Sequence, residues 1–202
     1  MADHYSVPLT AAEQRIIARL QKTDQAQREA GLSSEERTRN VAGATGAFLW
    51  QMVMSHRPGS LLEIGSSTGL STMWMASAAR RCGASLLGTE LIPERAKVNN
   101  ANLAEAHLDG VATVATGDHR SLDAVHGQKW DFVFLDAEKD DYLPHLKAIE
   151  PYLSTGAVIL ADNVTSHDCH VLQDYLRASS NYSTFTIPLD RGIEFAVYLG
   201  NE

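Results

Sequence analysis

The pattern of apolar and polar positions along the chain alternates between two periods. Short, almost wholly apolar runs at residues 61–64 and 132–135 are typical of buried parallel strands. Between such runs lie longer segments whose apolar residues recur three and four positions apart, the spacing of amphipathic helices. Regular alternation of the two patterns predicts an α/β protein built on a parallel sheet.

The predicted elements follow one another at short intervals. We expect strands at residues 60–65, 84–90, 111–117, 130–136 and 157–162, and helices at 69–81, 93–107, 120–126, 141–153 and 167–179. Two last strands, 183–188 and 193–199, are joined by four residues, which predicts a hairpin. The pattern therefore predicts a doubly wound, mainly parallel seven-stranded sheet with a C-terminal antiparallel hairpin.

Helices are also predicted before the first strand. Ile16, Ile17 and Leu20 indicate an amphipathic helix within residues 10–30. The segment from Ser33 to Glu36 has the composition of a helix start, and a further helical pattern covers residues 41–54. We expect one domain over residues 1–202, with N-terminal helices in 1–57 and the sheet in 58–202.

The amino-acid composition and net charge of the chain limit the kinds of molecule that it is expected to bind. The chain has 202 residues, 44% hydrophobic and 21% charged, which suits one globular domain. Its net charge of −8 disfavours a large nucleic-acid-binding face without excluding a local one. Neither a targeting segment nor a membrane-spanning stretch is evident, so we expect a cytoplasmic protein that does not bind a membrane. Two isolated cysteines predict neither a disulfide framework nor a zinc site.

The strongest functional signal lies where the first strand meets the following helix. The apolar run ends at Gly65, and small residues including Ser67 and Thr68 lead to Gly69. Glycines allow close approach of the backbone to a ligand. The spacing lacks the dinucleotide fingerprint and the lysine of a phosphate-binding loop, which favours a nucleoside ligand without a pyrophosphate. Glu90 ends the second strand, where a carboxylate can accept hydrogen bonds from a ribose.

Oxygen-bearing side chains end two further strands. Asp136 follows one apolar run, and Asp162 and Asn163 follow the next. Ligands of open α/β sheets bind beyond the carboxyl ends of the strands, so we expect these three side chains to converge. Two carboxylates and an amide suit Mg²⁺, with Ca²⁺ or Mn²⁺ as alternatives. A structural alternative is that the aspartates cap the following helices.

With these residues in hand, the chain resembles the class I S-adenosylmethionine-dependent methyltransferases. Within them it is similar to the small cation-dependent O-methyltransferases, which include catechol and caffeoyl-CoA O-methyltransferases. The resemblance runs from about residue 40 to residue 200 and is strongest in LLEIGSSTGLS, FVFLDAEKDDYLP and VILADNV. It implies a Rossmann-like sheet, a cofactor lid within residues 1–57, and methyl transfer from S-adenosylmethionine to a hydroxyl oxygen.

The resemblance also implies roles for single residues. Lys139, beside Asp136, would take the proton from the acceptor hydroxyl, whose pKa a divalent cation lowers. No general acid is required, because the sulfonium leaves as a neutral thioether. The candidates for cofactor binding are Val41, Glu63, Gly65, Ser67, Thr68, Ser71, Glu90, Leu91, Asp118, His119 and Asp136.

The acceptor side departs from catechol-type relatives, which have aromatic and apolar walls there. This chain has Arg37 and Ala137-Glu138 at those places, Arg39 before Asn40, and His167 after the metal-binding aspartate. Guanidinium groups bind carboxylates or phosphates in bidentate fashion. We therefore expect a small polar or anionic acceptor with vicinal oxygens, bound by Arg37, Arg39, Lys139 and His167. The alternative is that both arginines point to solvent.

Three other interpretations remain open at this point. Some relatives of this family methylate hydroxylated uridine in tRNA, and a protein could keep the cofactor seat without turnover. An NAD-dependent oxidoreductase is disfavoured by the glycine spacing. Relatives are often dimers, and the amphipathic N-terminal helix is compatible with a homodimer.

Overall fold

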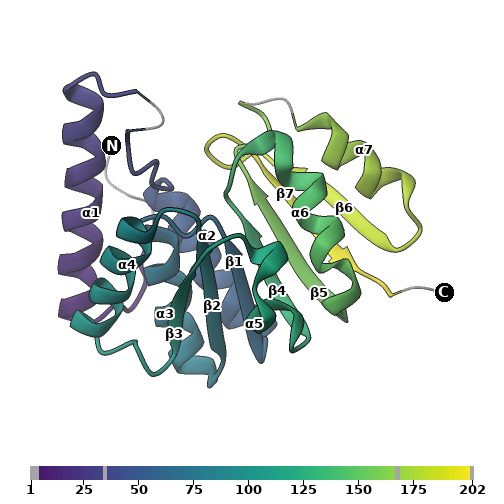
Figure 1. Ribbon diagram of the computed structural model, residues 1–202, viewed down its shortest axis with the longest axis horizontal. Helices are drawn as coiled ribbons and strands as arrows, with labels where there is room; N and C mark the ends of the chain where they lie inside the picture. The colour runs from purple at the N-terminus through teal and green to yellow at the C-terminus, as the bar shows by residue number, and fades with distance from the viewer. Residues whose placement is uncertain (1–4, 34–35, 167–168, 201–202) are drawn as a thin grey trace.

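The computed structural model describes residues 5–33, 36–166 and 169–200. Its seven-stranded sheet has the order β3-β2-β1-β4-β5-β7-β6 (Figure 1). The strands are β1 (Ser60–Ile64), β2 (Ser85–Glu90), β3 (Ala112–Thr116), β4 (Trp130–Leu135), β5 (Leu153–Asp162), β6 (Tyr182–Ile187) and β7 (Ile193–Tyr198). Strands β1 to β5 pair in parallel, and β7 lies between β5 and β6, antiparallel to both. The predicted Rossmann-like sheet and terminal hairpin are therefore confirmed.

Successive side chains of each strand point to opposite faces of the sheet, and helices cover both faces. Leu61 of β1 packs with the first group of helices, whereas Leu62 packs with the second. The first group is α1 (Ala11–Glu29), α2 (Gly43–His56), α3 (Leu70–Cys82) and α4 (Pro93–Glu105), and the second is α5 (Asp123–His126), α6 (Tyr142–Ile149) and α7 (His170–Ala178). In the described residues, no helix is both long and apolar enough to cross a membrane.

The predicted helix over residues 141–153 is shorter in the structure, and the strand after it is longer. A 3₁₀ turn at Lys139–Asp141 leads into α6, which ends at Ile149, and a second 3₁₀ turn covers Glu150–Tyr152. Pro151 lacks the backbone N–H that would continue the helix. The chain then enters β5 at Leu153, which pairs with Trp130.

The helix start predicted at residues 33–36 lies partly outside the described residues, because residues 34 and 35 are not described. Ser33 N donates to the Glu36 carboxylate (2.9 Å) and Glu36 N to Ser33 Oγ (3.4 Å), which are the reciprocal bonds of a capping box. In the described part of residues 31–42, however, no helix follows. The backbone N–H and the hydroxyl of Thr38 instead bond to the side-chain oxygen of Gln27 on α1 (2.9 and 3.1 Å). This contact draws the chain along α1 rather than into a new helix.

Residues 37–42, which we call the strap, cross from α1 to the turn that follows β1. Asn40 Nδ2 donates to the Leu20 carbonyl of α1 (3.1 Å), and Ser67 Oγ donates to the Thr38 carbonyl (2.7 Å). Arg39 takes a left-handed backbone conformation within the strap (φ 47°). The strap thus connects the N-terminal helices to the carboxyl edge of the sheet.

Candidate active site

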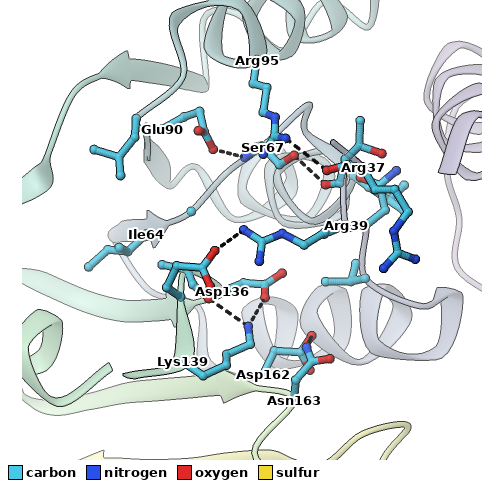
Figure 2. Close-up of a pocket in the computed structure, with 18 of the residues that line it drawn as sticks. Arg37, Arg39, Ile64, Ser67, Glu90, Arg95, Asp136, Lys139, Asp162 and Asn163 are labelled. Atoms are coloured by element: carbon cyan, nitrogen blue, oxygen red, sulfur yellow. Dashed lines mark hydrogen bonds and ion pairs between the residues drawn. The ribbon is translucent and has the colours of Figure 1, made fainter. Parts of the chain in front are cut away.

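A cavity of about 1050 Å³ lies at the carboxyl ends of β1, β2, β4 and β5, under the strap. Figure 2 shows Ser67 and Glu90 at one end of this cavity and Asp136, Lys139, Asp162 and Asn163 at the other. The predicted site residues that line it are Arg37, Arg39, Val41, Gly65, Ser67, Glu90, Leu91, Asp118, His119, Asp136, Lys139, Asp162 and Asn163. The structure therefore brings most of the predicted site residues together, although they are spread between residues 37 and 163 of the sequence.

The turn at residues 65–69, the cofactor turn, faces Glu90. Ser67 N donates to Glu90 Oε2 (2.8 Å), and Ile92 N donates to Oε1 (2.9 Å), so both oxygens of this buried carboxylate are fixed. Each oxygen keeps a second lone pair that can accept a hydroxyl. Gly65 has φ 93°, and a Cβ there would lie 2.5 Å from the Asp136 carbonyl, so no side chain fits. The fixed carboxylate and open backbone suit a ribose.

Two asparagines of α4 hold the cofactor turn from behind. Asn99 Nδ2 donates to the carbonyls of Ser66 (3.2 Å) and Ser67 (3.4 Å), and Asn102 Nδ2 donates to the carbonyl of Thr68 (2.9 Å). Both asparagines are buried. Three successive carbonyls are thereby turned away from the cavity. We call Asn99 and Asn102 the amide clamp.

Three predicted cofactor residues, Glu63, Thr68 and Ser71, do not line the cavity. Side chains alternate along β1, so Glu63 points away from the ligand side and accepts from Thr72 Oγ1 of α3 (2.5 Å). Burial raises the pKa of Glu63, and hydrogen bonds from Ser71 and Thr72 oppose that rise. All three side chains are buried outside the cavity lining, so their contact with a cofactor remains a prediction from the sequence.

Asp118 and His119 lie in the cavity wall after β3. Arg120 holds Asp118 in a charge-assisted pair (2.6 Å) and lowers the pKa of that carboxyl to about 2. The His119 ring packs edge-on against His145 of α6, with 4.6 Å between centroids. Burial lowers the pKa of His119 to about 4 and also lowers that of His145. His145 was not predicted, because nothing in the sequence places α6 beside the end of β3.

The opposite end of the cavity joins two carboxylates to a lysine. Lys139 Nζ donates to Asp136 Oδ1 (2.8 Å) and to Tyr142 Oη (2.7 Å), and Tyr142 donates to the Asp162 carbonyl (3.0 Å). Asn163 has a left-handed backbone (φ 64°), and its Nδ2 donates to the Asp162 carboxylate. Tyr142 was missed by the sequence analysis. It connects the Lys139 amine to the backbone carbonyl of Asp162.

We call the end of the cavity with Asp136, Lys139, Asp162 and Asn163 the metal end. Its electrostatics suit a cation. Burial raises the pKa of Asp162 to about 7, and the neighbouring Asp136 carboxylate adds to the rise. Burial also raises the pKa of Asp136, which Lys139 opposes. Among the residues that the structure describes, no three His, Cys, Asp or Glu side chains form a metal-binding group. The available donors are two carboxylates and an amide, a set that fits a hard cation retaining water or substrate oxygens.

The predicted acceptor residues have different environments. Arg39 reaches across the cavity and pairs with Glu138 (2.5 Å), and that carboxylate raises the pKa of Arg39. Arg37 lines the cavity, and its buried Nε has no hydrogen-bond partner among the residues that the structure describes. His167 lies outside the described residues. The predicted free cation at residue 39 is therefore neutralised within the chain.

Four further arginines line the cavity without having been predicted as site residues, namely Arg28, Arg95, Arg120 and Arg191. Arg95, in the first turn of α4, donates to the Arg37 carbonyl (3.1 Å). Its place in the helix that follows Glu90 is a signal that sequence analysis could have used. Arg191 lies between β6 and β7. Its approach to Asn163 depends on the position of β7 in the sheet, which the sequence order does not reveal.

Comparison with known proteins identifies the family. A family model described as a methyltransferase domain matches residues 62–164. Catechol O-methyltransferase of Mus musculus is 32% identical over 182 residues, covering 83% of this chain and 68% of that protein. The Sus scrofa enzyme of that name is 32% identical over 181 residues, covering 82% and 96%. This chain belongs to the class I S-adenosylmethionine-dependent O-methyltransferases.

A solved O-methyltransferase supports the fold of this O-methyltransferase. The Streptomyces achromogenes enzyme involved in tomaymycin synthesis, solved in complex with S-adenosylmethionine, superimposes with a TM-score of 0.76 at 23% identity, covering 96% of this chain and 92% of that one. The methyltransferase match over residues 62–164 contains the cofactor turn, Glu90 and the metal end. The strap and Arg191 lie outside it.

Proposed function

We propose that this O-methyltransferase transfers the methyl group of S-adenosylmethionine to a hydroxyl oxygen of a small acceptor with vicinal oxygens, with the help of a divalent cation. The observation that carries the proposal is the presence of Asp136, Asp162, Asn163 and Lys139 in the same cavity as Glu90. A protein that only bound the cofactor would have no use for the metal end. Catechol, named in the mammalian relatives, is a vicinal diol of the required kind.

In this proposal the cofactor lies along the carboxyl edge of the sheet. The two fixed oxygens of Glu90 accept the ribose hydroxyls, and Asp118 and His119 border the adenine. Val41 of the strap covers the methionine end. This arrangement aligns the methyl group with the metal end, and alignment supplies a large part of the rate enhancement.

Asp136, Asp162 and Asn163 would hold the cation, with Mg²⁺ as the first choice and Ca²⁺ or Mn²⁺ as alternatives. When bound, the cation supplies Lewis acidity that lowers the pKa of the acceptor hydroxyl. Lys139 is the candidate base, because its amine lies within 2.8 Å of Asp136 and so beside the same hydroxyl. Tyr142 limits the movement of Lys139 by accepting one of its N–H bonds.

The acceptor in this proposal is polar or anionic. Support comes from the cavity wall, which contains Arg37 and the Arg39–Glu138 ion pair. A flat hydrocarbon face gains little from such a wall, whereas charged substituents gain hydrogen bonds.

The test combines binding and turnover. S-adenosylhomocysteine should raise the melting temperature, because a ligand that binds only the folded state stabilises it. Methyl transfer to catechol-type diols should require Mg²⁺, stop with EDTA and return when Mg²⁺ is restored. A shift with NAD but none with S-adenosylhomocysteine would contradict the cofactor assignment. Undiminished transfer in EDTA would contradict metal dependence, and methylation of tRNA transcripts alone would favour the nucleic-acid alternative.

We also propose that the protein forms a homodimer. Support comes from the outer face of α1, where Ala18, Ala26 and Leu32 line an open groove. Light scattering during gel filtration tests this directly: a mass near 44 kDa, about twice 22.0 kDa, is expected. The single domain over residues 1–202 and the cytoplasmic location remain predictions from the sequence.

A further inference from the structure

The cations that line the cavity differ in whether a carboxylate neutralises them. The paired ones are Arg28 with Asp24, Arg39 with Glu138, Arg120 with Asp118 and Lys139 with Asp136. Arg191 also lines the cavity, and its side chain forms no ion pair with any residue in 5–33, 36–166 or 169–200. It is exposed, so its guanidinium is available to a ligand in the cavity mouth.

The backbone of Arg191 is fixed against the metal end. Thr165 N donates to the Arg191 carbonyl (2.9 Å), and Val164 N donates to the Gly192 carbonyl (3.1 Å). Val164 and Thr165 directly follow the metal candidate Asn163. The hairpin tip therefore lies on the loop that carries one side of the metal end.

The other side of the hairpin tip is tied to α2. Asp190 accepts hydrogen bonds from Thr45 N (3.1 Å) and Thr45 Oγ1 (2.5 Å). Gly192 has φ 81°, and a Cβ there would lie 2.3 Å from Thr165 Cγ2, so the tip packs closely. With both flanks anchored, Arg191 is carried by a backbone that has little freedom to move. A side chain on a fixed backbone loses less freedom when it binds a ligand.

Arg37 also lines the cavity without an ion pair to any described residue, but it has a different position. Its carbonyl is bonded to Arg95 of α4 (3.1 Å), and Figure 2 shows Arg37 beside Ser67, at the cofactor end of the cavity. Arg191 is thus the unpaired cation that the backbone contacts connect to Asn163.

We propose that Arg191 binds a carboxylate of the methyl acceptor while the vicinal oxygens of the same molecule lie at the metal end. The acceptor is then a carboxylated vicinal diol rather than a neutral catechol. A guanidinium binds a carboxylate through two parallel hydrogen bonds, which sets both affinity and orientation. This inference rests on the proposed function and names its substrate class.

The experiment compares 3,4-dihydroxybenzoate, catechol and 3,4-dihydroxybenzylamine as acceptors with S-adenosylmethionine and Mg²⁺. The readout is the ratio of kcat/KM for the benzoate to that for catechol. Arg191→Ala should lower this ratio about tenfold or more, Arg191→Lys should retain part of it, and Arg191→Glu should favour the benzylamine. Arg15→Ala, an exposed arginine on α1 outside this cavity, is the matched control and should keep the wild-type ratio.

A second readout separates this inference from the proposed function. The melting-temperature shift caused by 3,4-dihydroxybenzoate is measured with Mg²⁺ and S-adenosylhomocysteine present. A shift that disappears in Arg191→Ala supports the carboxylate site even if no diol is methylated, which would overturn the proposed function alone. If the diols are methylated with the same benzoate-to-catechol ratio of kcat/KM in wild type, Arg191→Ala and Arg191→Glu, that result overturns the carboxylate site and leaves the proposed function standing. No methylation, together with an equal shift in wild type and Arg191→Ala, overturns both.

Discussion

Glu90 combines two tasks in one side chain. Its oxygens accept backbone N–H groups from Ser67 and Ile92, which shapes the cofactor turn, and their second lone pairs remain for a ligand. The strand-end position alone predicted the ligand contact. The sequence could not show that the same carboxylate also holds the turn.

Glu90→Ala should weaken binding of S-adenosylhomocysteine by about 1.5 to 3 kcal/mol, because a charged hydrogen-bond acceptor is lost. Titration calorimetry measures the change. Glu94→Ala, an exposed glutamate in the first turn of α4, is the control and should bind like wild type. Equal affinity in both variants would remove Glu90 from the cofactor site.

Asp162 links metal binding to pH. Its pKa of about 7 lies above the ordinary 3.8, so the metal-free native protein holds a proton that the unfolded chain releases between pH 4 and 7. The stability contributed by this proton is lost as pH rises through 7. Because a cation needs the ionised carboxylate, the Mg²⁺-induced rise in melting temperature should grow between pH 5.5 and 8.

The test uses Asp162→Asn, which keeps the shape and removes the charge. This variant should lose the Mg²⁺-induced stabilisation at every pH and lower Mg²⁺-dependent turnover at least about a hundredfold. Its affinity for S-adenosylhomocysteine should stay within about twofold of wild type, since Asp162 lies at the other end of the cavity. Full activity in the variant would exclude Asp162 from the metal site.

The sequence could not show contacts between distant parts of the chain. Arg39 was predicted to bind an acceptor, and the sequence did not reveal its ion pair with Glu138. These residues are 99 positions apart, and no local pattern connects them. Asp136 and Asp162 were easier to predict, because each follows an apolar strand and all parallel strands end at one edge.

At the scale of elements, hydrophobic periodicity predicted every strand of the sheet and the order of its helices. The errors lie at boundaries set by single residues. Pro151 ends the helical region early, so β5 starts at Leu153 rather than at residue 157. Ser33 and Glu36 form the reciprocal bonds of the local capping signal, yet the described residues 36–42 form no helix, and Thr38 of the strap bonds to Gln27 of α1.

The amide clamp makes α4 a support for the cofactor turn. Asn99→Ala removes three hydrogen bonds, to Ser66, Ser67 and Thr72, and should destabilise the fold by about 1 to 3 kcal/mol. It should also weaken S-adenosylhomocysteine binding at least about threefold, because Ser67 N–H is no longer held toward Glu90. Urea unfolding and calorimetry measure the two effects.

Asn100→Ala is the matched control for the clamp. Asn100 lies on the same helix but bonds the backbone of Val114 in β3. The control should lose stability and keep the affinity of the native protein for the ligand. Parallel losses of affinity in both variants would mean that α4 supports the turn only through overall stability.

At the scale of the whole molecule, two buried imidazoles make the fold sensitive to acid. His119 has a pKa of about 4, and that of His145 is also lowered, whereas an unfolded histidine titrates near 6.5. At pH values between about 4 and 6.5, these histidines bind protons in the unfolded chain but stay neutral in the native protein. The stability due to neutral imidazoles is therefore complete above pH 6.5 and lost as pH falls toward 4.

Urea unfolding at pH 7.5 and 4.5 should show a loss of about 1 to 3 kcal/mol from this source. The measurement is best made in Asp162→Asn, because ionisation of Asp162 has the opposite dependence on pH. Adding His119→Asn should flatten the remaining slope. A slope that is unchanged by His119→Asn would show that His119 is not held neutral by burial.

The position of β7 between β5 and β6 has a consequence for synthesis on the ribosome. The chain emerges from its N-terminus, so β6 is made before β7, the strand with which it pairs. Until residues 193–198 have emerged, the outer edge of β5 has no neighbour, and Thr45 lacks its partner Asp190. A nascent chain that already contains every metal-end residue therefore still has an open strand edge and an unfinished cavity wall, and the segment from Asp190 through β7 closes both.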